Sequence, residues 1–415
     1  MDSDLNAPKA RQPKACLPRP FKTVTREQQL LGRRNRGTGK EPPYRLTRGA
    51  RTFSDEWMRR FIDGTLEVDL GKTPIPRVID EREEALAYAF FKKLRFAENN
   101  GEPFCPKCGC TKHYELNNPD RSKYPVYKCA GSGCYKQYTL TSGTLFNSRK
   151  LPYSVQLKLV VQFVEGVNGA SALQAHFDVG CQYMAAYHNE MKLRDAMASN
   201  RDRISLTGMI EMDGLHICKQ FPKENLSWQR KGKDRRNHDL NRVIMVVRQR
   251  GGATVGFADM DENAVTAHAA MRALVPSTEN PHIFVDDHAA YSNLGVFGKL
   301  HVVQHAKWYS VPDKESPTGR KSTNLVESAN SRIRCGQRGI YRHWDPVWLD
   351  LYAAEFGWRE TMSRRDNGTA IAELIGLALR HPVSRNFCGY YQRYLFPDAD
   401  LKRPEHRWAK VFHAT

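Results

Sequence analysis

The sequence has no long apolar run. Its longest apolar segments are short, such as Val243 to Val247, whereas a membrane span needs about 18 or more apolar residues in a row. The sequence therefore predicts no membrane-spanning segment. The first residues also lack the apolar stretch of a secretion signal, so we expect a protein that is not secreted.

Acidic residues are scarce relative to basic ones. The chain has 45 Asp and Glu against 64 Lys and Arg, which gives a net charge of +19 and a pI near 9.5. This surplus is larger than solubility requires and indicates a polyanionic partner, most commonly nucleic acid. Hydrophobic residues make up 40% of the chain, which excludes wholesale disorder, and 415 residues allow two or three compact domains.

Disulfide bonds are rare in proteins that are not secreted. The ten cysteines are therefore expected to be metal ligands or buried thiols. Four of them form two pairs, Cys105 with Cys108 and Cys129 with Cys134. Two such pairs on short β-like segments can supply four thiolates to one tetrahedral Zn²⁺, which predicts a zinc ribbon over residues 101–150. Two alternatives remain: Cys110 could replace Cys108, or the cysteines could be unrelated buried thiols.

The segments before the cysteines differ in composition. Residues 1–52 contain thirteen Lys and Arg against four Asp and Glu, a net charge of +9, and few aliphatic residues. We interpret them as a flexible basic arm, the alternative being a solvated tail without a role. Within residues 53–100, apolar residues recur at helical spacing between acids and bases, which predicts a packed helix that leads into the cysteine cluster.

Residues 151–200 read as three helical segments separated by short turns. This arrangement is typical of a helix-turn-helix domain, and the alternative is a general three-helix packing unit. From residue 205 to 362 the chain alternates between strands and helices in the order β-β-β-α-β-α-β-α, and a C-terminal extension, 363–415, follows. The fold class is therefore α/β with a mixed sheet. In this topology the first and fourth strands are adjacent.

Two aspartates lie on these strands, and we expect them to converge. Asp213 lies within the first strand and Asp286 ends the fourth. Two buried carboxylates repel each other unless a cation lies between them. Asn324 and Glu327 share one face of the helix that follows, and together these oxygen ligands suit Mg²⁺, which can activate water for phosphodiester cleavage. Alternatively, Asp213 is a turn residue before Gly214 and Glu327 is an exposed helix residue.

A basic loop follows the first strand. Residues 227–238, SWQRKGKDRRNH, are half Lys, Arg or His. Such a loop beside a metal site is suited to a phosphate backbone, and Trp228 could stack on a base. The alternative is a solvated loop.

The motifs of the chain resemble those of a known family, the bacterial insertion-sequence transposases of the ISXO-like group, which are related to eukaryotic Merlin elements. The resemblance runs from about Asp80 to Met362. The matching blocks are FCPKCG with YKC and QYTLTSGTLF for the ribbon, IEMDG, an Asp five residues before a Tyr, STNLVESANSRIR, and YAAEFGWR with Glu355, Phe356 and Arg359. Taken together these blocks are specific to the family.

The resemblance implies a DNA transposase with a zinc ribbon and a ribonuclease-H-like core. The ribbon and the helical domain would recognise the terminal inverted repeats, and at least a dimer would join two ends to target DNA. The resemblance implies that Asp213, Asp286 and Asn324 bind Mg²⁺ or Mn²⁺, with Glu327 as a companion acid. Arg334 stands where the family has a lysine and would contact phosphate.

Two departures from the family pattern define the alternative function. Arg334 replaces the family's lysine, and Asp287 stands where the family often has glycine. A catalytically inactive or domesticated transposase that only binds DNA is therefore the second hypothesis. We expect the protein in the cytoplasm on the nucleoid if its source is bacterial, and in the nucleus if it is eukaryotic.

Removal of residues 1–52 is expected to weaken DNA binding of every sequence without changing which ends are preferred. The reason is that the arm supplies charge, whereas specificity is assigned to the ribbon and helices. Dissociation constants for end and non-end duplexes at two salt concentrations test this division. A changed end preference in the truncated protein would contradict it.

Overall fold

In the computed structural model, the described residues belong to the part of the chain that spans Gly49–Thr415. They are residues 55–63, 84–116, 124–217, 242–259, 261–304, 309–342, 344, 348–384 and 387. The predicted basic arm and the loop 227–238 lie outside them. In this described part of the chain, no helix is long and apolar enough to cross a membrane.

A small three-stranded sheet carries the cysteine cluster. Its antiparallel strands are β1 (His113–Leu116), β2 (Val126–Cys129) and β3 (Gln137–Tyr138). The predicted helix before the cysteines is confirmed as α3 (Glu84–Arg95), against which α2 (Asp55–Ile62) packs. The Tyr88 hydroxyl of α3 lies 3.1 Å from the Tyr127 hydroxyl of β2, so the helix and the sheet share one core.

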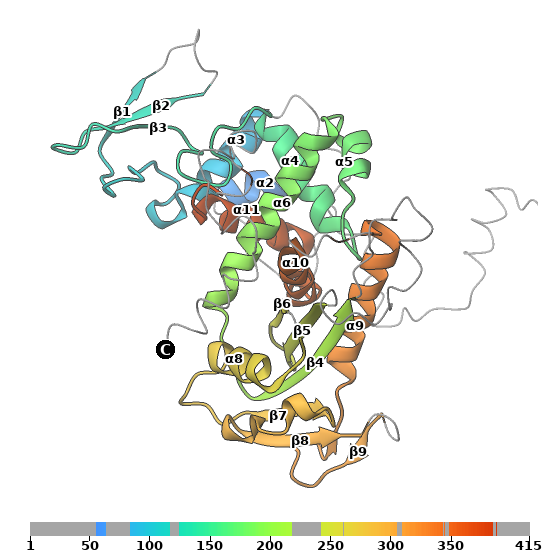
Figure 1. The fold of residues 1–415 in the computed structure, drawn as a ribbon. Coiled ribbons are helices and arrows are strands. Elements are labelled where there is room, and N and C mark those ends of the chain that lie inside the picture. The colour runs from blue at the N-terminus through green and yellow to red at the C-terminus, as the bar shows by residue number, and fades with distance from the viewer. Residues whose placement is uncertain are drawn as a thin grey trace, which may run out of the picture. The chain divides into compact units, whose positions relative to one another are not determined.

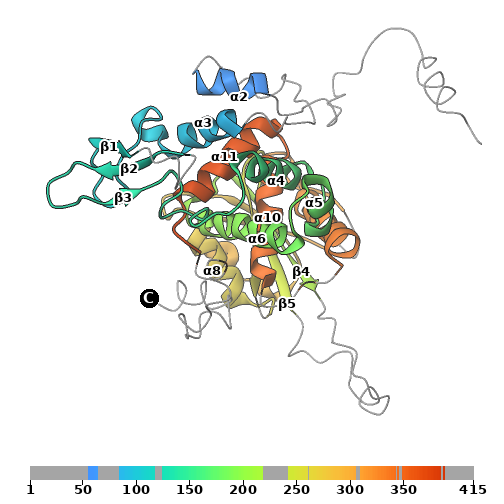
Figure 2. The same ribbon diagram turned by 90° about the horizontal axis from the view of Figure 1, so that it is seen from above.

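Three helices follow the small sheet where the apolar spacing predicted them. They are α4 (Tyr153–Glu165), α5 (Ala172–Val179) and α6 (Tyr183–Asn200). The Ser171 hydroxyl caps α5 by accepting from the Gln174 N–H, and Gly180 ends α5 in the left-handed conformation that favours glycine. A later helix, α11 (Asn367–Arg380), packs on α3, α4 and α6 (Figure 2).

A five-stranded mixed sheet forms the second half of the described chain (Figure 1). Its strands are β4 (Met209–Ile217), β5 (Arg242–Gln249), β6 (Thr254–Asp259), β7 (His282–Asp286) and β8 (Lys299–Val303). Their order is β6-β5-β4-β7-β8, with β4 antiparallel to β5 and parallel to β7. The prediction that the first and fourth strands are adjacent is therefore confirmed.

The two faces of this sheet are covered by different helices. Ile210 and Met212 of β4 point into a cluster with α8 (Ala264–Leu274). Leu215 and Ile217, which alternate with them, point into the cluster that contains α9 (Asn324–Cys335) and α10 (Leu349–Met362). Asp213 has the parity of Leu215, so it lies on the α9 face.

Close backbone contact joins α10 to β6. A Cβ atom on Gly256 would lie 2.5 Å from the carbonyl oxygen of Ala353, and one on Gly357 would lie 2.7 Å from the Gly256 nitrogen. Any larger side chain at either position would therefore push α10 off the sheet. The glycine of the YAAEFGWR block has this packing role.

One predicted element and one loop differ from expectation. The helix expected over residues 289–298 is instead two short 3-10 turns, η6 (Ala289–Tyr291) and η7 (Leu294–Val296). Serine, asparagine and glycine between and within them are weak helix formers, and the turns bury Tyr291 and Leu294 in the α8 cluster. The proline-containing loop before α9 contains a small hairpin, β9 (Val311–Pro312) with β10 (Arg320–Lys321).

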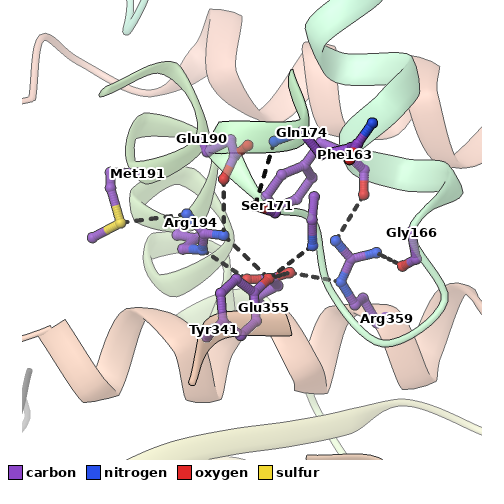
Figure 3. A network of polar contacts seen from close by, with 11 residues as sticks. Phe163, Gly166, Ser171, Gln174, Glu190, Met191, Arg194, Tyr341, Glu355 and Arg359 are labelled. Carbon is purple, nitrogen blue, oxygen red and sulfur yellow. Dashed lines mark hydrogen bonds and ion pairs between the residues drawn. The ribbon is translucent and has the colours of Figure 1, made fainter. Parts of the chain in front are cut away.

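A buried network of charged side chains joins α6 to α10 (Figure 3). The Arg194 and Arg359 Nε atoms donate to the two oxygens of the Glu355 carboxylate, each at 2.7 Å. Arg359 also donates to the Phe163 carbonyl oxygen near the end of α4, and the Tyr341 hydroxyl donates to Glu355. Burial disfavours the Glu355 charge, yet the two guanidinium groups lower the pKa of this carboxyl, so it stays ionised.

Substitution of Glu190 by Gln tests the electrostatics of this network. Burial, and next the charge of Glu355, raise the pKa of Glu190 from 4.5 to about 7 even though Arg194 and Arg359 face it. The pKa of Glu190 is higher in the folded state than in the unfolded state. The free energy of unfolding therefore falls as the pH rises from the unfolded-state pKa to the folded-state pKa, and it levels off above that pH. Between about pH 6 and about pH 8 the unfolding free energy of the wild type should fall by about 1 kcal/mol relative to that of Glu190→Gln, which has no carboxyl group to ionise.

Denaturant unfolding at the two pH values measures this difference. Glu98→Gln, at an exposed position of the same chain, is the matched control and should show no such difference from the wild type. Equal pH profiles for Glu190→Gln and the wild type would show that the buried charge carries no penalty.

Candidate functional site

Four cysteine sulfur atoms gather at one end of the small sheet. Cys105 Sγ lies 3.7 Å from Cys134 Sγ, Cys108 Sγ lies 3.5 Å from Cys129 Sγ, and all four lie within 4.8 Å of one another. A zinc–sulfur bond of about 2.3 Å places the corners of a tetrahedron about 3.8 Å apart. The donor set and its spacing therefore fit a structural zinc ion.

Cys110 stays outside this group, so the set in which it replaces Cys108 is not formed. Its sulfur instead donates to the Lys112 carbonyl oxygen. Burial opposes ionisation of Cys105, but the backbone N–H groups of Lys107 and Cys108 donate to its sulfur and lower the pKa of the thiol to about 7. A thiol with such a pKa readily becomes the thiolate that a metal needs.

The large sheet brings Asp213 and Asp286 together. The parallel register of β4 and β7 pairs Glu211 with Phe284, and two more residues along each strand lead to Asp213 and Asp286. The two carboxylates therefore lie level on neighbouring strands and on the same face. Figure 1 shows α9 beside β4, the strand on which it packs.

The pKa values of Asp213 and Asp286 are both raised, as expected for carboxylates that lie close together. Burial raises the pKa of Asp213 to about 7, and the charges of Asp286 and Glu262 add to this effect. Burial also raises the pKa of Asp286, and Glu262 contributes again. Near neutral pH the site thus holds acids whose ionisation a cation would favour.

Glu262, which the sequence analysis did not single out, is a third carboxylate at this site. It precedes α8, and its side chain is buried. The Tyr291 hydroxyl donates to one of its oxygens, and His216 Nε2 lies 2.9 Å from the other. Its position between the third strand and the next helix was the available signal, but an acid before a helix is ordinarily a surface residue that complements the helix dipole.

Asn330 is the residue of α9 that contacts Asp213, through a hydrogen bond of 2.7 Å from Nδ2 to Oδ2. The start of α9 is held by Glu211, whose Oε2 accepts the N–H groups of Leu325 and Val326, each at 2.9 Å. Arg250 donates to the other oxygen of Glu211 at 2.7 Å. A buried carboxylate at a helix N-terminus thus sets where α9 lies over the sheet.

The other predicted residues lie elsewhere on α9. Asn324 is its first residue and is exposed, and Glu327, one turn later, accepts a hydrogen bond from the Thr323 hydroxyl. Arg334, near the end of the helix, is exposed. The structure thus brings the two aspartates together, and Asn330 of α9 contacts Asp213.

Substitution of Cys129 by Ser should release the zinc ion, because three thiolates no longer close the tetrahedron. We expect zinc content to fall well below about one ion per chain, together with loss of the ordered ribbon in near-UV circular dichroism. Elemental analysis of purified protein gives the zinc content. Cys110→Ser is the matched control, and zinc loss there equal to that of Cys129→Ser would show that the ligand set is wrong.

Comparison with known proteins agrees with this geometry. Residues 82–137 match the family model of the transposase zinc-ribbon domain, and residues 205–361 match that of the ISXO2-like transposase domain. No curated protein and no solved structure matches the chain. The first segment contains the four cysteines and the second contains the acidic site. With both domains present in this order, the chain belongs to the ISXO2-like transposases of the IS1595 family.

Proposed function

We propose that the protein binds transposon ends, cleaves a DNA strand with divalent cations and transfers the freed end to target DNA. The observation that carries the proposal is the pairing of Asp213 and Asp286 on adjacent parallel strands. Family membership supports DNA as the substrate. The mixed sheet, with three antiparallel strands and two parallel ones, supports a ribonuclease-H-like core.

The residues present fit a divalent cation. The pKa of Asp213 is raised to about 7, first by burial and then by its acidic neighbours. The positive charge near this carboxylate therefore does not balance the negative charge of the site. The donors are hard oxygens, which suit Mg²⁺ or Mn²⁺ rather than zinc. When bound, such ions stabilise charge on the attacked phosphate and lower the pKa of the attacking water or 3′-hydroxyl.

Different side chains are proposed to bind the cation and the DNA. Asp213 on the central strand β4 and Asp286 on its neighbour β7 would hold the cation, and we propose that Asn324 or Glu327 completes the site once DNA is bound. Arg334 is exposed on the same helix, and its guanidinium can donate two parallel hydrogen bonds to a phosphate. These contacts would orient the scissile phosphate in line with the attacking oxygen.

DNA recognition is proposed for the zinc ribbon and the helices α4 to α6, the latter as a helix-turn-helix-like domain. On the ribbon, Tyr114 and Tyr135 are each 63% exposed, among lysines such as Lys112 and Lys136. Exposed aromatic rings with basic neighbours are suited to stacking on bases beside phosphates. The net charge of +19 would supply affinity that does not depend on sequence.

The domain division proposed for these roles follows the sequence. It comprises a basic arm (1–52), a helical segment (53–100), the ribbon (101–150), the helical domain (151–200), the catalytic domain (205–362) and an extension (363–415). Because two transposon ends must be joined to one target, we also propose at least a dimer on DNA. A non-catalytic DNA-binding protein is the alternative, suggested by Arg334 in place of lysine.

Asp213→Ala and Asp286→Ala should each abolish strand transfer while leaving end binding intact. Loss of a carboxylate that holds the cation is expected to lower the rate by about three orders of magnitude or more. The measurement uses duplexes with the terminal repeats that flank the coding sequence, in Mg²⁺ or Mn²⁺, with end binding followed by gel shift.

The matched control is Asp202→Ala, at an exposed position outside the sheet, which should keep wild-type activity. Wild-type protein that binds these ends but yields no product in either metal would favour the non-catalytic alternative.

A further inference from the structure

The carboxylate of Glu262 is held against the backbone beside Asp213. A Cβ atom built on Gly214 would lie 2.4 Å from Glu262 Cδ and 2.5 and 2.6 Å from its two oxygens. Glycine at position 214 therefore leaves the room that this carboxylate occupies. Gly214 directly follows Asp213 on β4 and has the parity of Met212, so the Glu262 carboxylate lies against the α8 face of the strand that carries Asp213.

Asn330 provides an independent observation at the same place. The residue is only 6% exposed, and its Nδ2 donates to Asp213 Oδ2. Its Oδ1 is buried and accepts no hydrogen bond. A buried amide oxygen without a donor is costly, and one placed beside a carboxylate is a ligand atom that a hard cation can use.

We propose that Glu262 and Asn330 are further ligands of the divalent-cation site, beside its two aspartates. The inference rests on the proposed function, whose cation it supplies with an additional carboxylate and an amide oxygen. The four side chains come from β4, β7, α9 and the segment before α8, so the cation would tie together elements on both faces of the sheet.

The ligand atoms of these side chains would have to move closer together to bind one cation. Among the described residues, the four cysteines are the only group of three or more Cys, His, Asp or Glu residues whose ligand atoms all lie within 4.8 Å of one another. Three carboxylates that repel one another stay apart, and a cation would draw them together. Tyr291 and His216, which contact the Glu262 carboxylate, would then orient it towards the cation.

Manganese affinity of the full-length, zinc-loaded protein tests this inference, with free Mn²⁺ measured by electron paramagnetic resonance. Glu262→Gln removes a charge and should weaken binding by about tenfold or more, whereas Asn330→Asp adds a ligand charge and should tighten it by about as much. Gly214→Ala keeps all four side chains but displaces the Glu262 carboxylate, so it should also weaken binding. Glu279→Gln, at an exposed position after α8, is the matched control and should bind as the wild type does.

The outcomes separate this inference from the proposed function. Wild-type affinity in Glu262→Gln and Gly214→Ala, or no Mn²⁺ binding by the wild type, would overturn the inference, and strand transfer by the wild type would still uphold the transposase. Weakened binding in both variants, without strand transfer by the wild type, would uphold the ligands and defeat the proposed reaction. Should Glu262→Gln fail to fold, as circular dichroism would reveal, the opposite shifts of Asn330→Asp and Gly214→Ala decide the question.

Discussion

The geometry of the acidic site depends on one buried carboxylate, that of Glu211, at the N-terminus of α9. It is 1% exposed and accepts the N–H groups of Leu325 and Val326. Asp213 lies two residues beyond Glu211 on β4, a rise of about 6.6 Å. Asn330 lies four residues beyond Val326 on α9, a rise of about 6 Å. Asp213 and Asn330 therefore come level, and the hydrogen bond between them follows from where the helix begins.

The same reasoning explains which features could be predicted from the sequence. The four cysteines were found because each pair closes a turn within a few residues, whereas the choice between Cys108 and Cys110 needed the folded geometry. The adjacency of β4 and β7 was found because few sheet orders suit the alternation of strands and helices. Asn330 and Glu262 were missed because their positions depend on packing between distant segments; Asn330 and Asp213 are 117 residues apart. Helical periodicity identifies a face of α9 but not the turn that lies over β4.

The block YAAEFGWR illustrates a motif whose residues have a structural role. Glu355 and Arg359 lie in the network that joins α10 to α4 and α6, and Arg194 is 161 residues from Glu355. Full burial makes each charge dependent on its partners, because a lone ion there would be strongly disfavoured. A small tilt of α6 relative to α10 would separate these ions, so the network fixes the angle between α6 and α10, the helix that packs on the five-stranded sheet.

The packing of α11 against α3 has a consequence for synthesis of the chain. Arg95 of α3 donates to the Leu379 carbonyl oxygen, 284 residues later, and the Leu145 N–H donates to the Ala378 carbonyl oxygen. On a ribosome that adds about 5–20 residues per second, α3 would wait roughly 15–60 s for this partner. Until then the apolar surface that α11 covers is open to water or to chaperones. Only a chain translated past residue 380 can complete the helical support of its own zinc ribbon.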